Sequence, residues 1–406
     1  MSNTLITSSM ITNETLRILH NESIFLGRIN RQYDDQFAKT GAKAGATVNV
    51  RRPVQYTVRD GATLAIQDVQ ETQVPITVDP EFGIDWAFQD FDLTLSIDKF
   101  SERYLVPAGR RLATELDSRI AGLYKQVYNF SGTPGTPPTT AALLLDPGAK
   151  MSDSIAPTDD RCFTLSPTVQ AGAVAGLSGL FNSQSEIGNQ YKKGTMGNAL
   201  GYEFNMSQTL PTHTVGAHGG TPLVNGAGQE QSTWTNTMSL VTDGWDNSIT
   251  GILKEGDVFT IANVNQVNQE TKASTGNLQQ FVVRADADSG ASTGPATLTI
   301  SPAIITSGAY QNVDAAPADD AAITVVGTAS TGYVQNMAFH KDAFTLVTCD
   351  MELPKGTDMA ARSVYDGVSL RFIRDYDVTN NRRICRFDIL AGFAALRPEW
   401  ACRVPN

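Results

Sequence analysis

The sequence predicts an α+β protein in which a small antiparallel β-barrel domain is inserted into a larger parent domain. Three observations lead to this prediction: a long amphipathic helix over residues 107–127, alternating strand segments on both sides of it, and a change of composition over residues 213–332. The chain has 406 residues, of which 41% are hydrophobic and 18% charged, as is typical of a folded protein with two to three domains.

The long helix is predicted from apolar residues that recur every three or four positions. They form one stripe, made of Leu112, Leu116, Ile120, Leu123 and Val127. Ser96 suits the N-cap of a short helix that ends near Leu105, and Pro107 suits the first turn of the long one. Five charged residues are expected to lie largely off the stripe: Arg110, Glu115, Asp117, Arg119 and Lys125. An ordinary core helix has the same pattern, but the flanking sequence favours a scaffold element.

Two segments precede this helix. Residues 10–38 have the spacing of a helical arm capped by Thr12 or Asn13, which packs on its own domain or on another chain. Residues 46–88 alternate as two strands around a turn at 60–61, and Pro53, Pro75 and Pro80 suit strand edges. A two-stranded ribbon is marginal in water, so we expect it to lie on a neighbouring subunit, with a local sheet as the alternative.

The segments after the helix alternate between loops and short elements. Residues 131–149 are predicted as a loop rich in Pro, Gly and Thr, followed by a buried strand at 161–167 and a helix of small residues at 168–181. Gly194, Gly197 and Gly201 are spaced for close turns, because the spacing is not that of a phosphate-binding loop and no GK[ST] opens a helix.

Residues 213–332 differ from the rest in composition. They contain three basic and eleven acidic residues, a net charge of −8 out of −11 for the chain. Turn signals separate short strands, at 238–242, 257–264, 279–285, 296–304 and 321–327. Strands at such intervals predict a small β-barrel or sandwich, inserted as a separate domain.

The C-terminal segment returns to the pattern of the parent domain. Residues 340–347 have helical spacing, and residues 367–377 and 381–396 alternate as two long strands with a turn at 380–381. Val368, Leu370 and Phe372 are expected on one face of the first strand.

No catalytic, cofactor-binding or metal-binding residues are predicted, and an enzyme is not expected. His213 and His218 lie in a Gly-rich loop without the partners of a metal site. A carboxylate cluster of Asp85, Asp90 and Asp92 is conceivable, but a solvated strand end explains them better.

The remaining candidate groups are basic pairs and thiols. Arg51–Arg52 and Arg382–Arg383 could contact phosphate or a neighbouring carboxylate, and we expect salt bridges between subunits. Cys162, Cys349, Cys385 and Cys402 are predicted to be reduced and mostly buried, as in a cytosolic protein. The start of the chain lacks the pattern of a signal peptide, and no apolar run is long enough for a membrane span.

The order of these segments resembles that of the major capsid (coat) proteins of tailed double-stranded DNA bacteriophages, in the P22-type branch with the Hong Kong 97 fold. The most specific likeness lies in residues 191–214, with KKGTMGNALGYEFNMSQTLPTHT, and in residues 337–400, with FHKDAFTLVTCDMELP and GVSLRFIRDYDVTNNRRICRFDILAGFAALRPEWA. The resemblance implies six regions: an N-terminal arm (1–45), an E-loop with flanking strands (46–95), the spine helix and peripheral domain (96–150), the first part of the axial domain (151–214), the inserted β-barrel (215–332) and the remainder of the axial and peripheral domains (333–406).

The resemblance also implies a function. Such a protein self-assembles into the hexamers and pentamers of an icosahedral head, first as a procapsid that expands when double-stranded DNA is packaged. The implied partners are other copies of the chain, a scaffolding protein and a portal, with no membrane; assembly would occur in the host cytoplasm and the product would be the virion. A net charge of −11 fits a shell that encloses DNA with little specific contact. The alternatives are a tail or cement protein, or a hydrolase with a β accessory domain.

Overall fold

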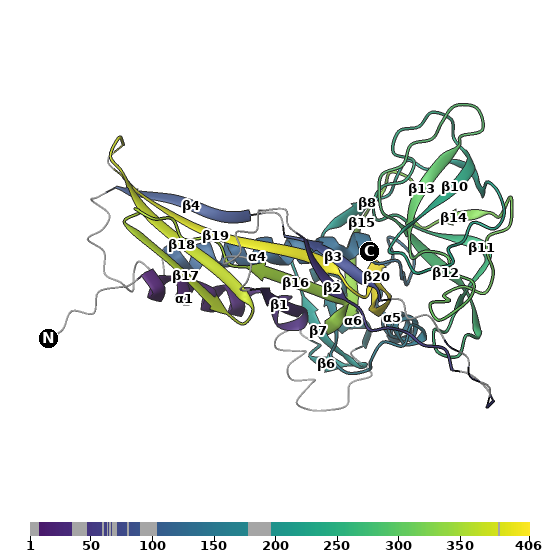
Figure 1. The fold of residues 1–406 in the computed structure, drawn as a ribbon, viewed down its shortest axis with the longest axis horizontal. Coiled ribbons are helices and arrows are strands. Elements are labelled where there is room, and N and C mark those ends of the chain that lie inside the picture. The colour runs from purple at the N-terminus through teal and green to yellow at the C-terminus, as the bar shows by residue number, and fades with distance from the viewer. Residues whose placement is uncertain are drawn as a thin grey trace. The chain divides into compact units, whose positions relative to one another are not determined.

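The computed structural model describes residues 8–34, 47–58, 61, 62, 64, 66, 71–78, 81–89, 104–177, 196–380 and 382–406. The chain forms two compact units (Figure 1). The first combines residues up to Val50 with Pro75–Ala121 and Phe344–Ala394, and the second combines Arg51–Val74, Gly122–Ala343 and Ala395–Asn406. Several residues named above lie outside the described ranges: Asp60, Pro80, Asp90, Asp92, Ser96, Gly194 and Asn381.

The first unit is built on a six-stranded sheet. Its order is β1-β16-β19-β18-β17, with β4 also paired to β19. The strands are β1 (Asn30–Asp34), β4 (Glu81–Gln89), β16 (Phe344–Cys349), β17 (Met359–Tyr365), β18 (Val368–Asp377) and β19 (Arg382–Ala395). The predicted strands near the C-terminus are confirmed, and Val368, Leu370 and Phe372 are all buried, as their alternation indicated.

Helix α1 (Ser8–Glu22) packs against α4, β17 and β18 within this unit. The predicted arm is therefore helical at its start, and it contacts its own chain. Two details were wrong. The helix begins at Ser8 rather than at Thr12 or Asn13, and it ends at Glu22, after which a 3-10 turn η1 (Leu26–Arg28) leads into β1. β1 pairs in parallel with β16, and this long-range pairing overrides the local helical spacing.

The predicted long helix is confirmed as α4 (Val106–Ala121), followed by the 3-10 turn η4 (Gly122–Gln126). All five residues of the apolar stripe are buried. Glu115 and Arg119 form the expected ion pair at 2.9 Å. Asp117 is a correction, because it lies in the buried interior with only 3% of its surface exposed.

The ribbon begins and ends in a two-stranded sheet of β2 (Thr47–Arg51) and β3 (Gln73–Thr77). Val74, Ile76 and Val78 are buried in alternation, as predicted. The second strand does not run unbroken to residue 88, since β3 and β4 are separate strands in different sheets.

The second unit contains a sheet in the order β20-β15-β5-β7-β6, with β8 also paired to β15. Its strands are β5 (Arg161–Leu165), β6 (Asn198–Ala199), β7 (Tyr202–Met206), β8 (Thr212–Thr214), β15 (Gly332–His340) and β20 (Ala401–Pro405). The helices are α5 (Ala141–Asp153), α6 (Pro167–Leu177) and the 3-10 turns η5 (Lys341–Ala343) and η6 (Pro398–Trp400). The predicted strand and small-residue helix near residue 165 are confirmed as β5 and α6.

Two predictions in this part of the chain were wrong. The segment 131–149 is not all loop, because α5 begins after Thr140, whose side chain accepts a hydrogen bond from the Leu143 N–H. The segment 340–347 is not a helix, because it contains the end of β15, the turn η5 and the start of β16. Every residue of β16 is buried, which hides the period-two alternation of an ordinary strand.

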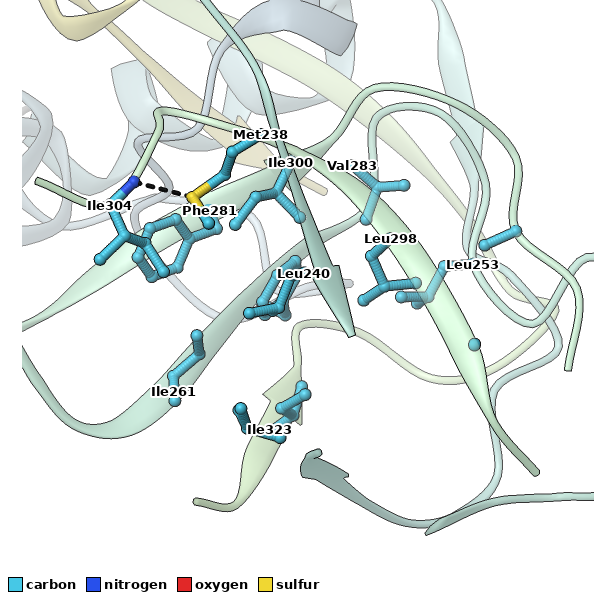
Figure 2. Close-up of a cluster of buried hydrophobic side chains, with 14 of the residues drawn as sticks. Met238, Leu240, Leu253, Ile261, Phe281, Val283, Leu298, Ile300, Ile304 and Ile323 are labelled. Carbon is cyan, nitrogen blue, oxygen red and sulfur yellow. Dashed lines mark hydrogen bonds between the residues drawn. The ribbon is translucent and has the colours of Figure 1, made fainter. Parts of the chain in front are cut away.

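The insert is a six-stranded antiparallel barrel in the order β14-β11-β12-β13-β10-β9. Its strands are β9 (Gly220–Val224), β10 (Met238–Trp245), β11 (Val258–Val267), β12 (Ser274–Val283), β13 (Ala296–Ser301) and β14 (Ile323–Val325). A bridge between Leu223 and Ala322 joins its two edges. Apolar side chains from the strands fill the interior (Figure 2), with Leu240, Phe281 and Leu298 fully buried. The predicted short strands and the barrel are confirmed.

Candidate assembly surfaces

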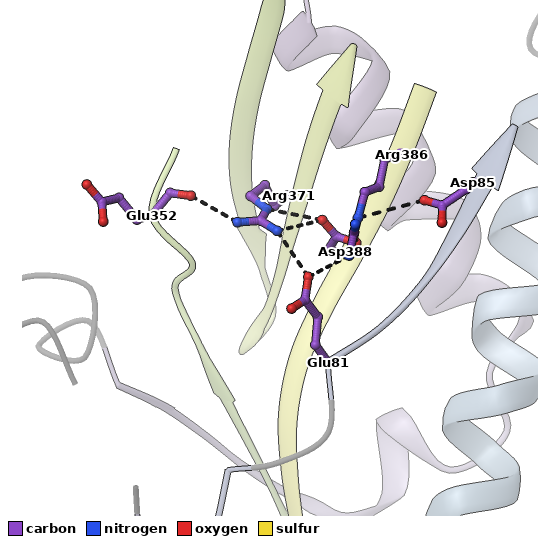
Figure 3. Close-up of polar contacts among 6 residues, drawn as sticks. All are labelled: Glu81, Asp85, Glu352, Arg371, Arg386 and Asp388. Carbon is purple, nitrogen blue, oxygen red and sulfur yellow. Dashed lines mark hydrogen bonds and ion pairs between the residues drawn. The ribbon is translucent and has the colours of Figure 1, made fainter. Parts of the chain in front are cut away.

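One face of the first unit's sheet carries a network of five charged side chains (Figure 3). Arg371 pairs with Asp388 at 2.7 Å and with Glu81 at 3.1 Å. Arg386 pairs with Asp388 at 2.6 Å, with Glu81 at 2.9 Å and with Asp85 at 3.7 Å. The hydrogen bond to Asp388 raises the pKa of Arg386. The network joins β4 to β18 across β19. It therefore fixes the position of β4, the strand that follows the ribbon, on the sheet of the first unit.

The ribbon itself exposes apolar side chains. Tyr56, Val58, Leu64 and Ile66 are 66%, 95%, 74% and 86% exposed, and all lie between β2 and β3. Large apolar residues so exposed on one short segment are typical of a surface that contacts another protein.

The insert is attached to its parent domain through buried polar groups. Asp257 has no exposed surface on its side chain and accepts hydrogen bonds from the N–H groups of Gly216 and Lys254, at 3.0 and 2.7 Å. His213 Nε2 lies 2.7 Å from the Asp257 carboxylate, and His213 Nδ1 lies 3.0 Å from the Tyr124 hydroxyl. Burial raises the pKa of Tyr124 to about 12, so this hydroxyl stays protonated at neutral pH.

A buried arginine borders the same attachment. Arg403 is 2% exposed, and its guanidinium lies 5.6 Å from the centre of the Tyr124 ring. Burial lowers the pKa of Arg403 to about 10. A cavity of about 20 Å³ adjoins Arg403, His213 and Asp257. That volume is enough for about one water molecule.

The histidines and the aspartate considered from the sequence have separate partners. His213 serves the attachment of the insert, whereas His218 Nε2 contacts the Gly327 carbonyl oxygen at 3.3 Å. Asp85 lies in the charge network and pairs with Arg386. Within the described ranges, no group of three or more His, Cys, Asp or Glu side chains is arranged to hold a metal ion. No described helix is long and apolar enough to cross a membrane.

The basic pairs have partners within the chain, and the expected salt bridges between subunits stay a prediction. Arg51 pairs with Glu71 at 3.4 Å, and Arg52 pairs with Glu399. Arg382 pairs with Asp377 at 3.0 Å, and Arg383 with Asp358 at 3.6 Å. All four cysteines are free and buried, as predicted.

The buried role of Asp117 was missed by sequence reasoning. Its carboxylate accepts hydrogen bonds from the Ser23 hydroxyl at 2.5 Å and from the N–H groups of Ile24 and Phe25 at 2.8 and 3.3 Å. Burial raises the pKa of Asp117, although these donors act in the opposite direction. Its position on α4, one residue after the buried Leu116, was the available signal.

An α+β body with an exposed apolar ribbon and an inserted barrel fits a structural protein of the capsid class. The family model of the P22 coat protein, gene protein 5, matches residues 20–403, and the chain belongs to this family. As a member of this family it is a phage major capsid (coat) protein, and not an enzyme.

The individual proteins that match this chain share only a modest part of its sequence. The major capsid protein of Acyrthosiphon pisum secondary endosymbiont phage 1 is 25% identical over 322 residues, which are 73% of each chain. A solved structure from Mycobacterium phage Che8 is 14% identical, with 94% of this chain and 90% of that chain covered and a TM-score of 0.46. The CUS-3 coat protein I-domain is 30% identical over 27% of this chain and 96% of its own, with a TM-score of 0.19.

Proposed function

We propose that copies of this chain form the hexamers and pentamers of an icosahedral head that encloses double-stranded DNA. The head assembles in the host cytoplasm as a procapsid around a scaffolding protein, and it expands as DNA enters through a portal. The six regions predicted from the sequence, from the arm at 1–45 to the final segment at 333–406, are the parts that carry out this assembly.

The observation that supports this proposal most directly is the exposed apolar surface of the ribbon. Val58 and Ile66 are 95% and 86% exposed. Burying such a side chain against a partner contributes about 1.5–3 kcal/mol, and a closed shell repeats the contact many times. The ribbon therefore suits contact with a neighbouring copy in the capsomer.

We propose that the shell makes little specific contact with the enclosed DNA, and the charge of the chain supports this. The net charge is −11, and the insert supplies most of it. Binding of DNA depends on clustered Lys and Arg that release counterions from phosphate. A shell of acidic subunits encloses a genome without holding it in place.

The proposal is tested by substitution of the ribbon. Val58→Asp with Ile66→Asp should reduce the fraction of chain in hollow particles, as measured by gradient sedimentation and electron microscopy. Leu278→Asp is the matched control, because Leu278 is also exposed, at 42%, but lies on the insert. Equal particle yields from the ribbon variant, the control and the unmodified chain would contradict the proposed neighbour contact.

A further inference from the structure

The root of the ribbon, defined as residues 52–55, is held by a buried ion pair. Arg52 pairs with Glu399, and their side chains are only 16% and 7% exposed. The backbone N–H of Arg52 also donates a hydrogen bond to the Thr72 carbonyl oxygen at 2.9 Å. This bond joins the outgoing and returning segments of the ribbon. Removing one partner of such a pair leaves a buried charge uncompensated, so the pair strongly favours one position of the root.

The insert makes the other contacts with the root. The Arg52 guanidinium lies 5.4 Å from the centre of the Trp234 ring, within the range of a cation–π interaction. Gln55 donates a hydrogen bond from Nε2 to the Gln269 Oε1 at 3.2 Å, and its backbone N–H lies 3.5 Å from the Tyr310 hydroxyl. Three residues of the barrel domain therefore contact a segment that precedes it by about 180 residues or more.

The contact is polar and borders an open pocket. This pocket has a volume of about 170 Å³ and lies among Arg52, Trp234, Tyr310 and Glu399. Polar and aromatic side chains line it, so this junction is not a continuation of the hydrophobic core. By contrast, β4 on the returning side has nine residues in register with β19, from Glu81 opposite Leu390 to Gln89 opposite Arg382. Beyond its pairing with the returning segment, the root of the ribbon is thus held by a few polar contacts, whereas β4 is paired along its whole length.

We propose that the insert acts as a releasable clamp on the root of the ribbon, in which Trp234 and Tyr310 hold Arg52 and Gln55 and the Arg52–Glu399 pair completes the clamp. The insert then sets the direction in which the ribbon leaves the subunit. This clamp lies within one chain, so it exists before any neighbouring copy is bound. Its failure is therefore distinguishable from failure of the neighbour contact proposed above.

The test is hydrogen exchange of the unassembled, full-length chain, followed in the segment 52–58. Trp234→Ala should accelerate amide exchange there about tenfold, because opening of the segment no longer breaks the contact with the Arg52 guanidinium. Trp234→Phe retains an aromatic face and should restore most of the protection. Leu278→Ala, an exposed position of the same barrel, is the matched control and should leave the segment unchanged.

Amides of Val282 and Val283 in β12 report whether the barrel remains folded. If Trp234→Ala unfolds the barrel, Arg52→Lys probes the same contact from the ribbon, because lysine retains the charge but loses the planar group that faces the indole. Accelerated exchange in Arg52→Lys supports the clamp. Exchange at the unmodified rate in a variant with a folded barrel, or equal acceleration in Leu278→Ala, would overturn it.

Discussion

Gly83 of β4 lies directly opposite Asp388 of β19. A Cβ atom on Gly83 would overlap the Phe387 carbonyl oxygen and would lie 2.8 Å from the Asp388 Oδ1. Asp388 is fully buried and holds both Arg371 and Arg386. The absence of a side chain at position 83 is what lets β4 approach β19 with the charged network in place.

Gly83→Ala is therefore expected to lower the free energy of unfolding by about 1–3 kcal/mol, the usual range for an overpacked site. Urea unfolding of the unassembled chain measures this change. Gly27→Ala is the matched control in the same unit, since an added Cβ there meets nothing within 4 Å. An equally small effect of both substitutions would show that β4 can move away from β19 at little cost.

Asp117→Ala should destabilise the first unit by about 3 kcal/mol, because the Ser23 hydroxyl and the N–H groups of Ile24 and Phe25 lose their acceptor. Asp117→Asn should reduce the stability of the first unit by less, since the amide oxygen still accepts a hydrogen bond and no buried charge remains. Thermal or urea unfolding separates the two variants. Glu115→Ala, which removes only the partly exposed pair with Arg119, should change stability by about 0.5 kcal/mol or less. Equal losses for Asn and Ala at position 117 would contradict this account.

Acid should release the turn between β17 and β18 from α1. Burial opposes ionisation of Asp366, but hydrogen bonds from Arg31 and His20 outweigh it and lower the pKa of this carboxyl below its ordinary value of 3.8. A depressed folded-state pKa contributes stability that is fully present above 3.8 and is lost as the pH falls through the lower value. Amide exchange in residues 364–368 should therefore accelerate below about pH 4.

Asp366→Asn is the control for this acid effect. The variant should exchange faster at neutral pH and show no further change at the pH where the unmodified chain opens. A transition of the same size in the variant would assign the effect to another group.

The four thiols should resist alkylation in the native chain. Burial raises the pKa of Cys385 to about 11 and that of Cys402 to about 12, so little reactive thiolate is present at pH 8. Cys162 and Cys349 are buried as well. Iodoacetamide with mass detection should label none of the four before unfolding and all four in denaturant. Labelling of any cysteine at native conditions would show that its surroundings open readily.

The insert should fold without the parent domain. Its barrel has a continuous interior in which Leu240, Phe281 and Leu298 are fully buried, and its edges are joined by the Leu223–Ala322 bridge. A fragment of residues 215–332 is expected to give a dispersed amide NMR spectrum. The same fragment with Phe281→Ala should lose about 3–5 kcal/mol of stability and supplies the control for packing. Narrow dispersion in the unmodified fragment would mean that the barrel needs its parent domain.

Sequence patterns predicted elements best where one face is buried and the other is solvated. The stripe that ends at Val127 and the alternation of Val368, Leu370 and Phe372 both have this property. β16 was mistaken for part of a helix because both of its faces are buried, so no alternation remains in its sequence. Pro147 and Gly148 inside α5 concealed a helix that its Thr140 cap could have indicated.

Side-chain roles were harder to predict than elements. Asp117 has the charge of a surface residue, but its hydrogen-bond partners lie more than ninety residues away in the chain. Arg52 was likewise expected to meet another subunit, whereas its partner Glu399 lies near the far end of the same chain. Spacing along a sequence carries no information on such distant partners.

Thr214 and Gly332, the residues that bound the insert, face each other in the β8–β15 ladder. The parent chain therefore leaves and resumes its path at neighbouring points of one sheet. A short peptide can close this gap, and a foreign domain whose termini are equally near can be grafted in place of the barrel. The position offers protein engineers a site for displaying enzymes or antigens on every copy of the subunit.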